Sequence, residues 1–226
     1  SHQNISYNGV TSVQELGDFR PGADGEVSIS FLPLSHIFAR TLYFGVLASG
    51  ITTYFSTPER LTQDLTDVRP TLFATVPRLL EKIHSRIVEK ATTLTGVKKK
   101  LLNWSLGLAG AYSLDAAPSG GYRLQLKLAD ALVFKKWRAA LGGRIKYIIS
   151  GGAALNPDLA NLFAAAGIRV LQGYGLTETS PVIAFNRPTR NRAGAVGELL
   201  PGVEAVLAED GELITRGPHV MLGYYN

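Results

Sequence analysis

A short polar segment, GYGLTETSP at residues 173–181, carries the residue types best suited to chemistry in this chain of 226 residues. Thr177 and Thr179 supply hydroxyls that can hydrogen-bond phosphate oxygens, and Tyr174 offers a flat face for a base or sugar. Glu178 stands among uncharged neighbours, and a single carboxylate beside phosphates is a typical ligand of Mg²⁺. The segment therefore predicts a phosphate and magnesium site. The alternative is that a threonine caps a turn and Glu178 points into water.

Two further candidates stand after other apolar runs. In SGGAAL, at residues 150–155, Gly151 and Gly152 remove side chains where a phosphate could approach the main chain, and a helix start follows. A tight strand-to-helix turn would explain this pair equally well. His36 stands in LPLSHIFAR at the end of an apolar run, where a satisfied core histidine is the alternative interpretation.

Several classes of chemistry are excluded by the residues themselves. The chain has no cysteine, so disulfides, zinc thiolate sites and thiol nucleophiles are absent. The other histidines, His2, His84 and His219, show no metal-ligand spacing, and there is no Ser-His-Asp pattern or G-x-x-x-x-G-K-[ST] loop. Phosphate chemistry without a protein nucleophile remains.

Composition points to an ordinary globular chain, with 46% hydrophobic residues and a net charge of +5. The excess charge suits a solvated surface or an anionic partner such as a nucleotide or lipid headgroup, whereas no RNA-binding motif accompanies it. No run approaches the roughly 18 apolar residues of a membrane span, and no signal-peptide pattern opens the chain. We therefore expect a cytoplasmic location and no nucleic-acid partner.

Strand-like and helix-like segments alternate along most of the chain, which predicts an α/β fold with a parallel-rich sheet and flanking helices. Ligands bind beyond the carboxyl ends of strands in such sheets, so both glycine segments and His36 should share one edge. Asn156 and Pro157 have the residue types of a helix N-cap and first turn, and Pro77 also starts a helix. The predicted strands are 26–32, 51–55, 71–76, 145–150 and 168–172, and the predicted helices are 35–49, 58–65, 77–91 and 156–166.

Two regions depart from this alternation. Residues 92–141 interleave Lys and Arg with Leu and Trp and predict two amphipathic helices, broken by a loop holding Pro118, Gly120 and Gly121. These helices either pack on the sheet or touch a membrane surface. Residues 203–207 and 212–215 predict a β-hairpin. We therefore expect an α/β subdomain at 1–193 and the start of a β-rich subdomain at 194–226.

The sequence resembles the acyl-activating, AMP-forming ligases, the superfamily of acyl-CoA synthetases, firefly luciferase and nonribosomal-peptide adenylation domains. GYGLTETSPV is similar to their adenine and Mg²⁺ binding motif. FLPLSHIFAR, TLFATVPRLLEKI, YIISGGAALNPDLANLF and GELITRGPHVMLGYYN match the family in order, over nearly the whole chain. LPLSHIFAR, VPRLLEKI and KKKLLNWSLGLAGAY look most like the long-chain fatty acyl-CoA synthetases.

The resemblance implies an N-terminal domain of that family and a two-step reaction. A fatty carboxylate, ionised at neutral pH and needing no general base, would attack ATP to give acyl-AMP, and coenzyme A would then take the acyl group. ATP or AMP, Mg²⁺ and coenzyme A are thus the implied cofactors and co-substrates, and a fatty acid is the implied substrate. The implied roles are Gly151, Gly152 and Ala153 on the adenine and acyl side, Gly173, Tyr174 and Gly175 beside the base, Thr177 on phosphate, Glu178 on Mg²⁺ and His36 near the acyl carboxylate.

The resemblance also implies that other parts of the family's site lie outside this chain: an upstream phosphate loop, a ribose-binding Asp, a hinge and a C-terminal domain with the catalytic Lys. We therefore expect an internal fragment that binds nucleotide weakly and is inactive alone, with sheet edges that favour homo-oligomers. The alternatives are a fatty acyl-AMP ligase that feeds a carrier protein and a non-catalytic acyl or nucleotide-binding module. Contact with the inner face of a membrane through the basic helices is a further expectation.

Overall fold

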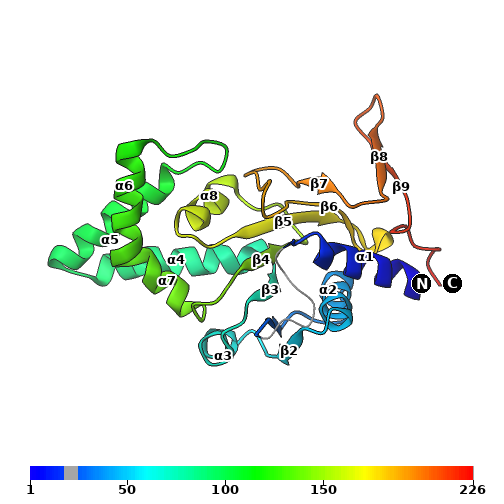
Figure 1. Ribbon diagram of the computed structural model, residues 1–226, viewed down its shortest axis with the longest axis horizontal. Helices are drawn as coiled ribbons and strands as arrows, with labels where there is room; N and C mark the ends of the chain where they lie inside the picture. The colour runs from blue at the N-terminus through cyan, green and yellow to red at the C-terminus, as the bar shows by residue number, and fades with distance from the viewer. Residues whose placement is uncertain (18–24, 226) are drawn as a thin grey trace.

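A mostly parallel sheet organises the chain in the computed structural model, which describes residues 1–17 and 25–225. Its seven strands lie in the order β2-β1-β3-β4-β5-β6-β7 (Figure 1). Neighbours from β2 to β5 are parallel, and the pairs β5–β6 and β6–β7 are antiparallel. This confirms the predicted α/β fold class. The strands are β1 Val27–Ser30, β2 Thr52–Phe55, β3 Leu72–Thr75, β4 Tyr147–Ser150, β5 Val170–Gly175, β6 Val182–Phe185 and β7 Glu198–Leu199.

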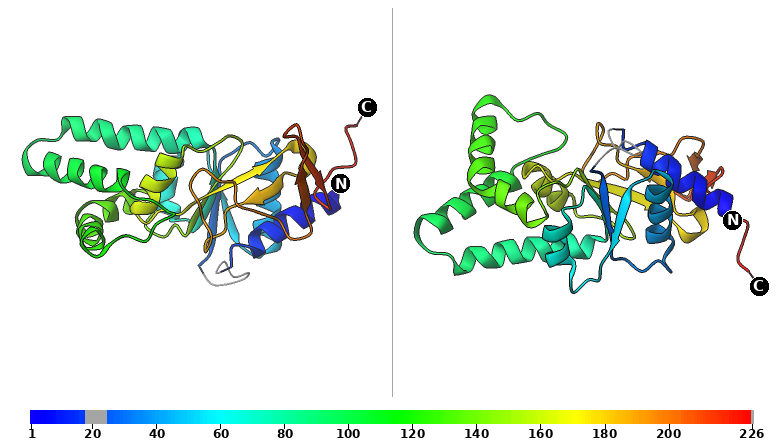
Figure 2. Two further views of the ribbon diagram at one scale, coloured as in Figure 1. Left: turned by 90° about the horizontal axis from the view of Figure 1, so that it is seen from above. Right: turned by 60° about the horizontal axis from the view of Figure 1, so that its bottom comes forward.

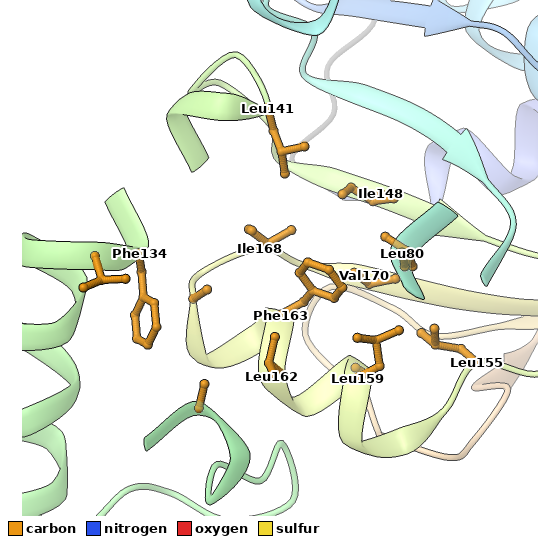
Figure 3. Packing of buried hydrophobic residues seen from close by; sticks show 14 of the residues in the cluster. Leu80, Phe134, Leu141, Ile148, Leu155, Leu159, Leu162, Phe163, Ile168 and Val170 are labelled. Carbon is orange, nitrogen blue, oxygen red and sulfur yellow. The ribbon is translucent and has the colours of Figure 1, made fainter. Parts of the chain in front are cut away.

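Helices cover both faces of this sheet, because successive side chains of a central strand point to opposite sides. In β4, Ile148 packs into a core with α4 and α8, while Tyr147 and Ile149 pack into a second core with α1 and α2. Figure 3 shows the first core, in which Leu159, Leu162 and Phe163 of α8 lie close to Ile168 and Val170. The helices that cover the sheet are α1 His2–Gln14, α2 Ile37–Ala48, α3 Leu61–Val68, α4 Pro77–Thr93 and α8 Pro157–Ala165.

Local sequence explains where the two helices of the first core begin. The Asn156 side chain accepts a hydrogen bond from the Asp158 N–H at 2.8 Å, and Pro157 takes the first helical position of α8. Pro77 likewise opens α4. These predictions are confirmed, and the predicted strands agree with the observed ones to within a few residues.

Residues 92–141 form a helical lobe that extends away from the sheet (Figure 2). It comprises α5 Gly96–Gly110, α6 Gly120–Ala129, a π-helical turn η1 Asp130–Phe134 and α7 Lys135–Ala140. The prediction that these helices pack on the sheet is corrected, since their main contacts are with one another and with the helices α3, α4 and α8. Gly120 and Gly121 belong to the first turn of α6, not to the preceding loop. Within the two described segments, no helix is long and apolar enough to cross a membrane.

Both ends of the chain contain elements that the residue pattern did not reveal. Helix α1 and strands β6 and β7 were not predicted, and residues 173–175, expected in a loop, are the end of β5 and pair with β6. The expected hairpin is present as β8 Glu204–Leu207 and β9 Leu213–Arg216, in a sheet of its own. Strand β7 follows residue 194 yet joins the large sheet, and the subdomain division at 193/194 stays a prediction.

Candidate active site

A cavity of about 330 Å³ opens at the carboxyl ends of β4 and β5, where α1 and α2 cover the sheet. This volume is within the range of small-molecule sites, about 300–1,000 Å³. The structure brings to its wall eight of the nine residues to which the family resemblance assigns a role. They are His36, Gly151, Gly152, Gly173, Tyr174, Gly175, Thr177 and Glu178. The ninth, Ala153, is exposed in the loop after β4 and does not line the cavity.

Gly175 is required by a close approach of two chain segments. A Cβ atom at this position would lie 1.8 Å from the carbonyl oxygen of Pro181. The pairing of β5 with β6 shifts register between Tyr174 and Gly175, which brings the following turn back over the strand end. Tyr174 itself is exposed at the cavity wall, as a residue that stacks on a base must be.

Thr177 and Thr179 differ, although they stand two residues apart in the 3-10 turn η2 Thr177–Thr179. Thr179 is buried, and its hydroxyl accepts a hydrogen bond from the Leu176 N–H at 2.8 Å and also bonds the Pro181 carbonyl. The expectation of a phosphate contact from Thr179 is therefore corrected, because the turn uses this hydroxyl. Thr177 is exposed at the cavity wall.

Glu178 is held by the last residues of the described chain. Its Oε1 accepts a hydrogen bond from the Tyr224 hydroxyl at 2.6 Å, and its carbonyl oxygen accepts one from the Met221 N–H at 2.8 Å. The Tyr224 hydrogen bond lowers the pKa of Glu178 below its usual range and raises the pKa of Tyr224. The carboxylate at the cavity is therefore ionised at neutral pH.

This carboxylate fits a magnesium ion that is shared with a bound phosphate. No group of three or more His, Asp or Glu side chains within residues 1–17 and 25–225 could hold a metal alone. Mg²⁺ commonly binds through one or two carboxylates, retained water and substrate phosphates. Glu178 is the only carboxylate among the described cavity residues, so phosphate oxygens and water would have to complete the shell.

His36 forms the N-cap of α2 and is exposed, so the interpretation as a core histidine is wrong. Its Nδ1 accepts a hydrogen bond from the Phe38 N–H at 3.2 Å. That bond assigns the proton of the neutral ring to Nε2, which can then donate to an anionic group in the cavity.

Helix α1 contributes residues that the sequence analysis missed. Asn8 is fully buried, and its side chain donates to the Val182 carbonyl at 2.8 Å and accepts from the Val182 N–H at 3.2 Å. Ser12, one turn later, lines the cavity with a buried hydroxyl that has no partner in the described part of the chain. Asn4, Asn8 and Ser12 recur every four residues, and this polar stripe was the available indication of a helix face turned toward a site.

The fold is an α/β domain with a cavity at the carboxyl edge of its parallel sheet, the place where ligands bind in folds of this class. The family model described as AMP-binding enzyme matches residues 1–225. The chain belongs to this family, the adenylate-forming ligases, and within it to the acyl-CoA ligases, which confirms the resemblance.

Curated relatives include a long-chain-fatty-acid–CoA ligase, FadD15 of Mycobacterium bovis, which is 34% identical over 206 residues, covering 89% of this chain and 34% of the relative. Long-chain-fatty-acid–CoA ligase 6 of Mus musculus is 35% identical over 240 residues, covering 99% of this chain and 33% of the relative. The chain thus spans about a third of the length of these relatives.

Solved structures share the fold at lower identity. O-succinylbenzoate coenzyme A synthetase (MenE) from Bacillus subtilis, in complex with ATP and magnesium ion, superposes with a TM-score of 0.64 at 19% identity, covering 100% of this chain and 39% of that one. Apo MatB from Rhodopseudomonas palustris superposes with a TM-score of 0.60 at 23% identity, covering 99% of this chain and 37% of that one. At this identity the likeness shows the fold alone.

Proposed function

We propose that the protein carrying this chain is an AMP-forming ligase that joins long-chain fatty acids to coenzyme A. The observation that supports this most is that residues from GYGLTETSP, SGGAAL and LPLSHIFAR line the same cavity in a member of the AMP-binding family. The relatives named as long-chain-fatty-acid–CoA ligases support the choice of substrate.

The reaction would proceed in two balanced steps. A fatty carboxylate oxygen bonds to the α-phosphorus of ATP as pyrophosphate leaves, and the coenzyme A sulfur then bonds to the acyl carbon as AMP leaves and the thiol proton passes to solvent. In the first step, the His36 Nε2–H would orient the carboxylate, and Thr177 would donate to phosphate. Mg²⁺ held at Glu178 would neutralise phosphate charge, which is the main catalytic demand of such a transfer.

The described cavity wall contains no Lys or Arg. Because cationic side chains are needed besides Mg²⁺ to stabilise the charge that develops around phosphorus, we expect the 226-residue chain alone to bind nucleotide weakly and to form no thioester. A non-catalytic nucleotide-binding module is the alternative for the whole protein, and a ligase that delivers acyl-AMP to a carrier protein is another.

The test uses the full-length natural protein and measures fatty-acid-dependent exchange of labelled pyrophosphate into ATP. We expect Glu178→Gln to lower the exchange rate about 100-fold, as loss of one key electrostatic group commonly does. Glu209→Gln is the matched control, since Glu209 is exposed and outside the cavity. Wild-type protein without exchange would favour the non-catalytic module. Mass spectrometry of the acyl product would separate coenzyme A from a carrier protein as acceptor.

We also propose peripheral contact with a membrane, because α6 and η1 present an exposed apolar stripe. Leu124, Leu128 and Leu132 recur every four residues and are 69%, 53% and 40% exposed. Exposed Lys127 and Lys135 lie near this stripe in the chain and suit an anionic surface. Co-sedimentation with anionic but not neutral vesicles, lost in Leu124→Gln/Leu128→Gln, is the expected result, and unchanged sedimentation of this variant would contradict it. A cytoplasmic location and self-association stay predictions.

A further inference from the structure

Residues 217–224, called the strap, follow β9 and pass from the start of α1 to the turn η2 (Figure 1). Most of the strap is exposed, and its side chains bury little apolar surface. Because buried apolar surface is what usually fixes a segment in place, the position of the strap depends on polar contacts.

Polar contacts hold the first half of the strap on two sides. The side-chain amide of Asn4, a buried residue of α1, donates to the carbonyls of Pro218 and Val220 at 2.7 Å and 2.9 Å. The His219 ring is fully buried, and its Nε2 lies 2.8 Å from the Thr215 hydroxyl of β9. The strap is therefore tied both to α1 and to the β-hairpin before it.

The second half of the strap reaches Glu178. The Met221 N–H donates to the Glu178 carbonyl at 2.8 Å, and the Tyr224 hydroxyl donates to Glu178 Oε1 at 2.6 Å. Between these two contacts the backbone passes through Gly223 at a φ of +139°, a conformation that residues with a side chain rarely adopt. The strap thus holds both the main chain and the carboxylate of Glu178.

The stability of the fold does not account for the Tyr224 contact. Tyr224 is 74% exposed, so water can replace much of the hydrogen bond that its hydroxyl makes. No other side chain in the two described segments hydrogen-bonds or ion-pairs with the Glu178 carboxylate, which leaves Oε2 for a cation. Hydrogen bonds to one oxygen of a carboxylate are a common means of orienting the other oxygen toward a metal.

We propose that Tyr224 is a positioning residue for the metal site, holding Oε1 of Glu178 so that Oε2 is oriented for Mg²⁺. A carboxylate that is already fixed in one orientation loses less conformational freedom when the ion binds. Tyr224 acts only through Glu178. The inference therefore rests on the proposed function, in which Glu178 is the ligand of Mg²⁺.

Nucleotide binding to the full-length protein tests this role without turnover, because fatty acid and coenzyme A are left out. The probe is ATP with a fluorescent mant group, and its Kd is measured once in Mg²⁺ and once in EDTA. The ratio of the two Kd values is the factor by which Mg²⁺ tightens binding. Tyr224→Phe should lower this factor about 10-fold, as loss of a hydrogen bond behind a metal ligand commonly does, and should leave the Kd in EDTA unchanged.

Tyr225→Phe is the matched control, because Tyr225 is the neighbouring tyrosine, is 95% exposed and makes no hydrogen bond through its hydroxyl to the described residues. It should leave the Mg²⁺ factor at its wild-type value. At about pH 8 the Glu178 carboxyl is ionised and the Tyr224 hydroxyl is protonated, so the comparison measures orientation and not charge. A merely structural role would also shift the urea midpoint of Tyr224→Phe, which we expect to stay unchanged.

A double-mutant cycle shows whether Tyr224 acts through Glu178. Glu178→Gln should itself lower the Mg²⁺ factor, and adding Tyr224→Phe to it should have no further effect. A further loss in the double variant would overturn the positioning role, because Tyr224 would then act independently of Glu178.

The single variants separate this inference from the proposed function. A lower Mg²⁺ factor in Glu178→Gln with an unchanged factor in Tyr224→Phe would overturn the role of Tyr224 alone. An unchanged factor in Glu178→Gln would overturn both the metal role of Glu178 and this inference. Ligase activity is tested apart from these variants, by pyrophosphate exchange in the wild-type protein.

Discussion

The Asn8 side chain offers the most direct test of how α1 supports the site. Asn8 is fully buried and satisfies both backbone groups of Val182, at 2.8 Å and 3.2 Å, while a third, longer contact of 3.4 Å reaches the Thr179 carbonyl. Asn8→Ala removes all three hydrogen bonds and leaves the chain after the turn η2 without its anchor.

The expected cost follows from the groups left without partners. A buried polar group that loses its hydrogen bond costs about 1–3 kcal/mol, and water can reach part of Val182, which is only half-buried. We therefore expect Asn8→Ala to lower the free energy of unfolding by about 2–3 kcal/mol.

Urea unfolding of the wild-type protein and of Asn8→Ala, followed by circular dichroism, gives this difference in the free energy of unfolding from the midpoints and slopes of the two curves. Asn103→Ala is the matched control, because Asn103 is an exposed position within α5. It carries the same gain in helix propensity as Asn8→Ala without losing a buried contact. A change below about 0.5 kcal/mol for Asn8→Ala, relative to this control, would refute the anchoring role.

Three further perturbations test other contacts of the same region. Gly175→Ala should destabilise the fold by about 1–3 kcal/mol or more, because the new methyl group clashes with a backbone carbonyl. The control Gly107→Ala lies in open space within α5 and should stabilise the fold slightly. Similar thermal midpoints for the two variants would contradict this prediction. Tyr224→Phe removes the hydrogen bond that lowers the Glu178 pKa, so the NMR titration midpoint of that carboxyl should move to higher pH, and an unmoved midpoint would argue against the contact. Burial lowers the pKa of His219, so the folded state holds the neutral ring and should lose stability as the pH falls below about 6.5. The urea midpoint measured between pH 8 and 5.5 should therefore depend less on pH in His219→Gln than in the wild-type protein. Equal pH dependence of the two proteins would reject this assignment.

Local signals in the sequence were sufficient to predict the α/β alternation and much of the site. Short β-prone runs, the Asn156 cap and Pro77 act on their immediate neighbours. Their effects on local structure can therefore be inferred from the sequence itself. The parallel sheet then brings the ends of β4 and β5 to one edge, which is why segments 22 residues apart, Gly151 and Gly173, could be expected to meet.

Contacts between distant segments were decided only by tertiary packing. The Asn8–Val182 and Glu178–Tyr224 pairs join residues 174 and 46 positions apart, and no local preference selects such partners. Packing also separated Thr177 from Thr179, two similar residues in one motif, by burying the second and leaving the first at the cavity. Residue types therefore determined which groups can do chemistry, whereas burial and long-range hydrogen bonds determined which of them are available for it.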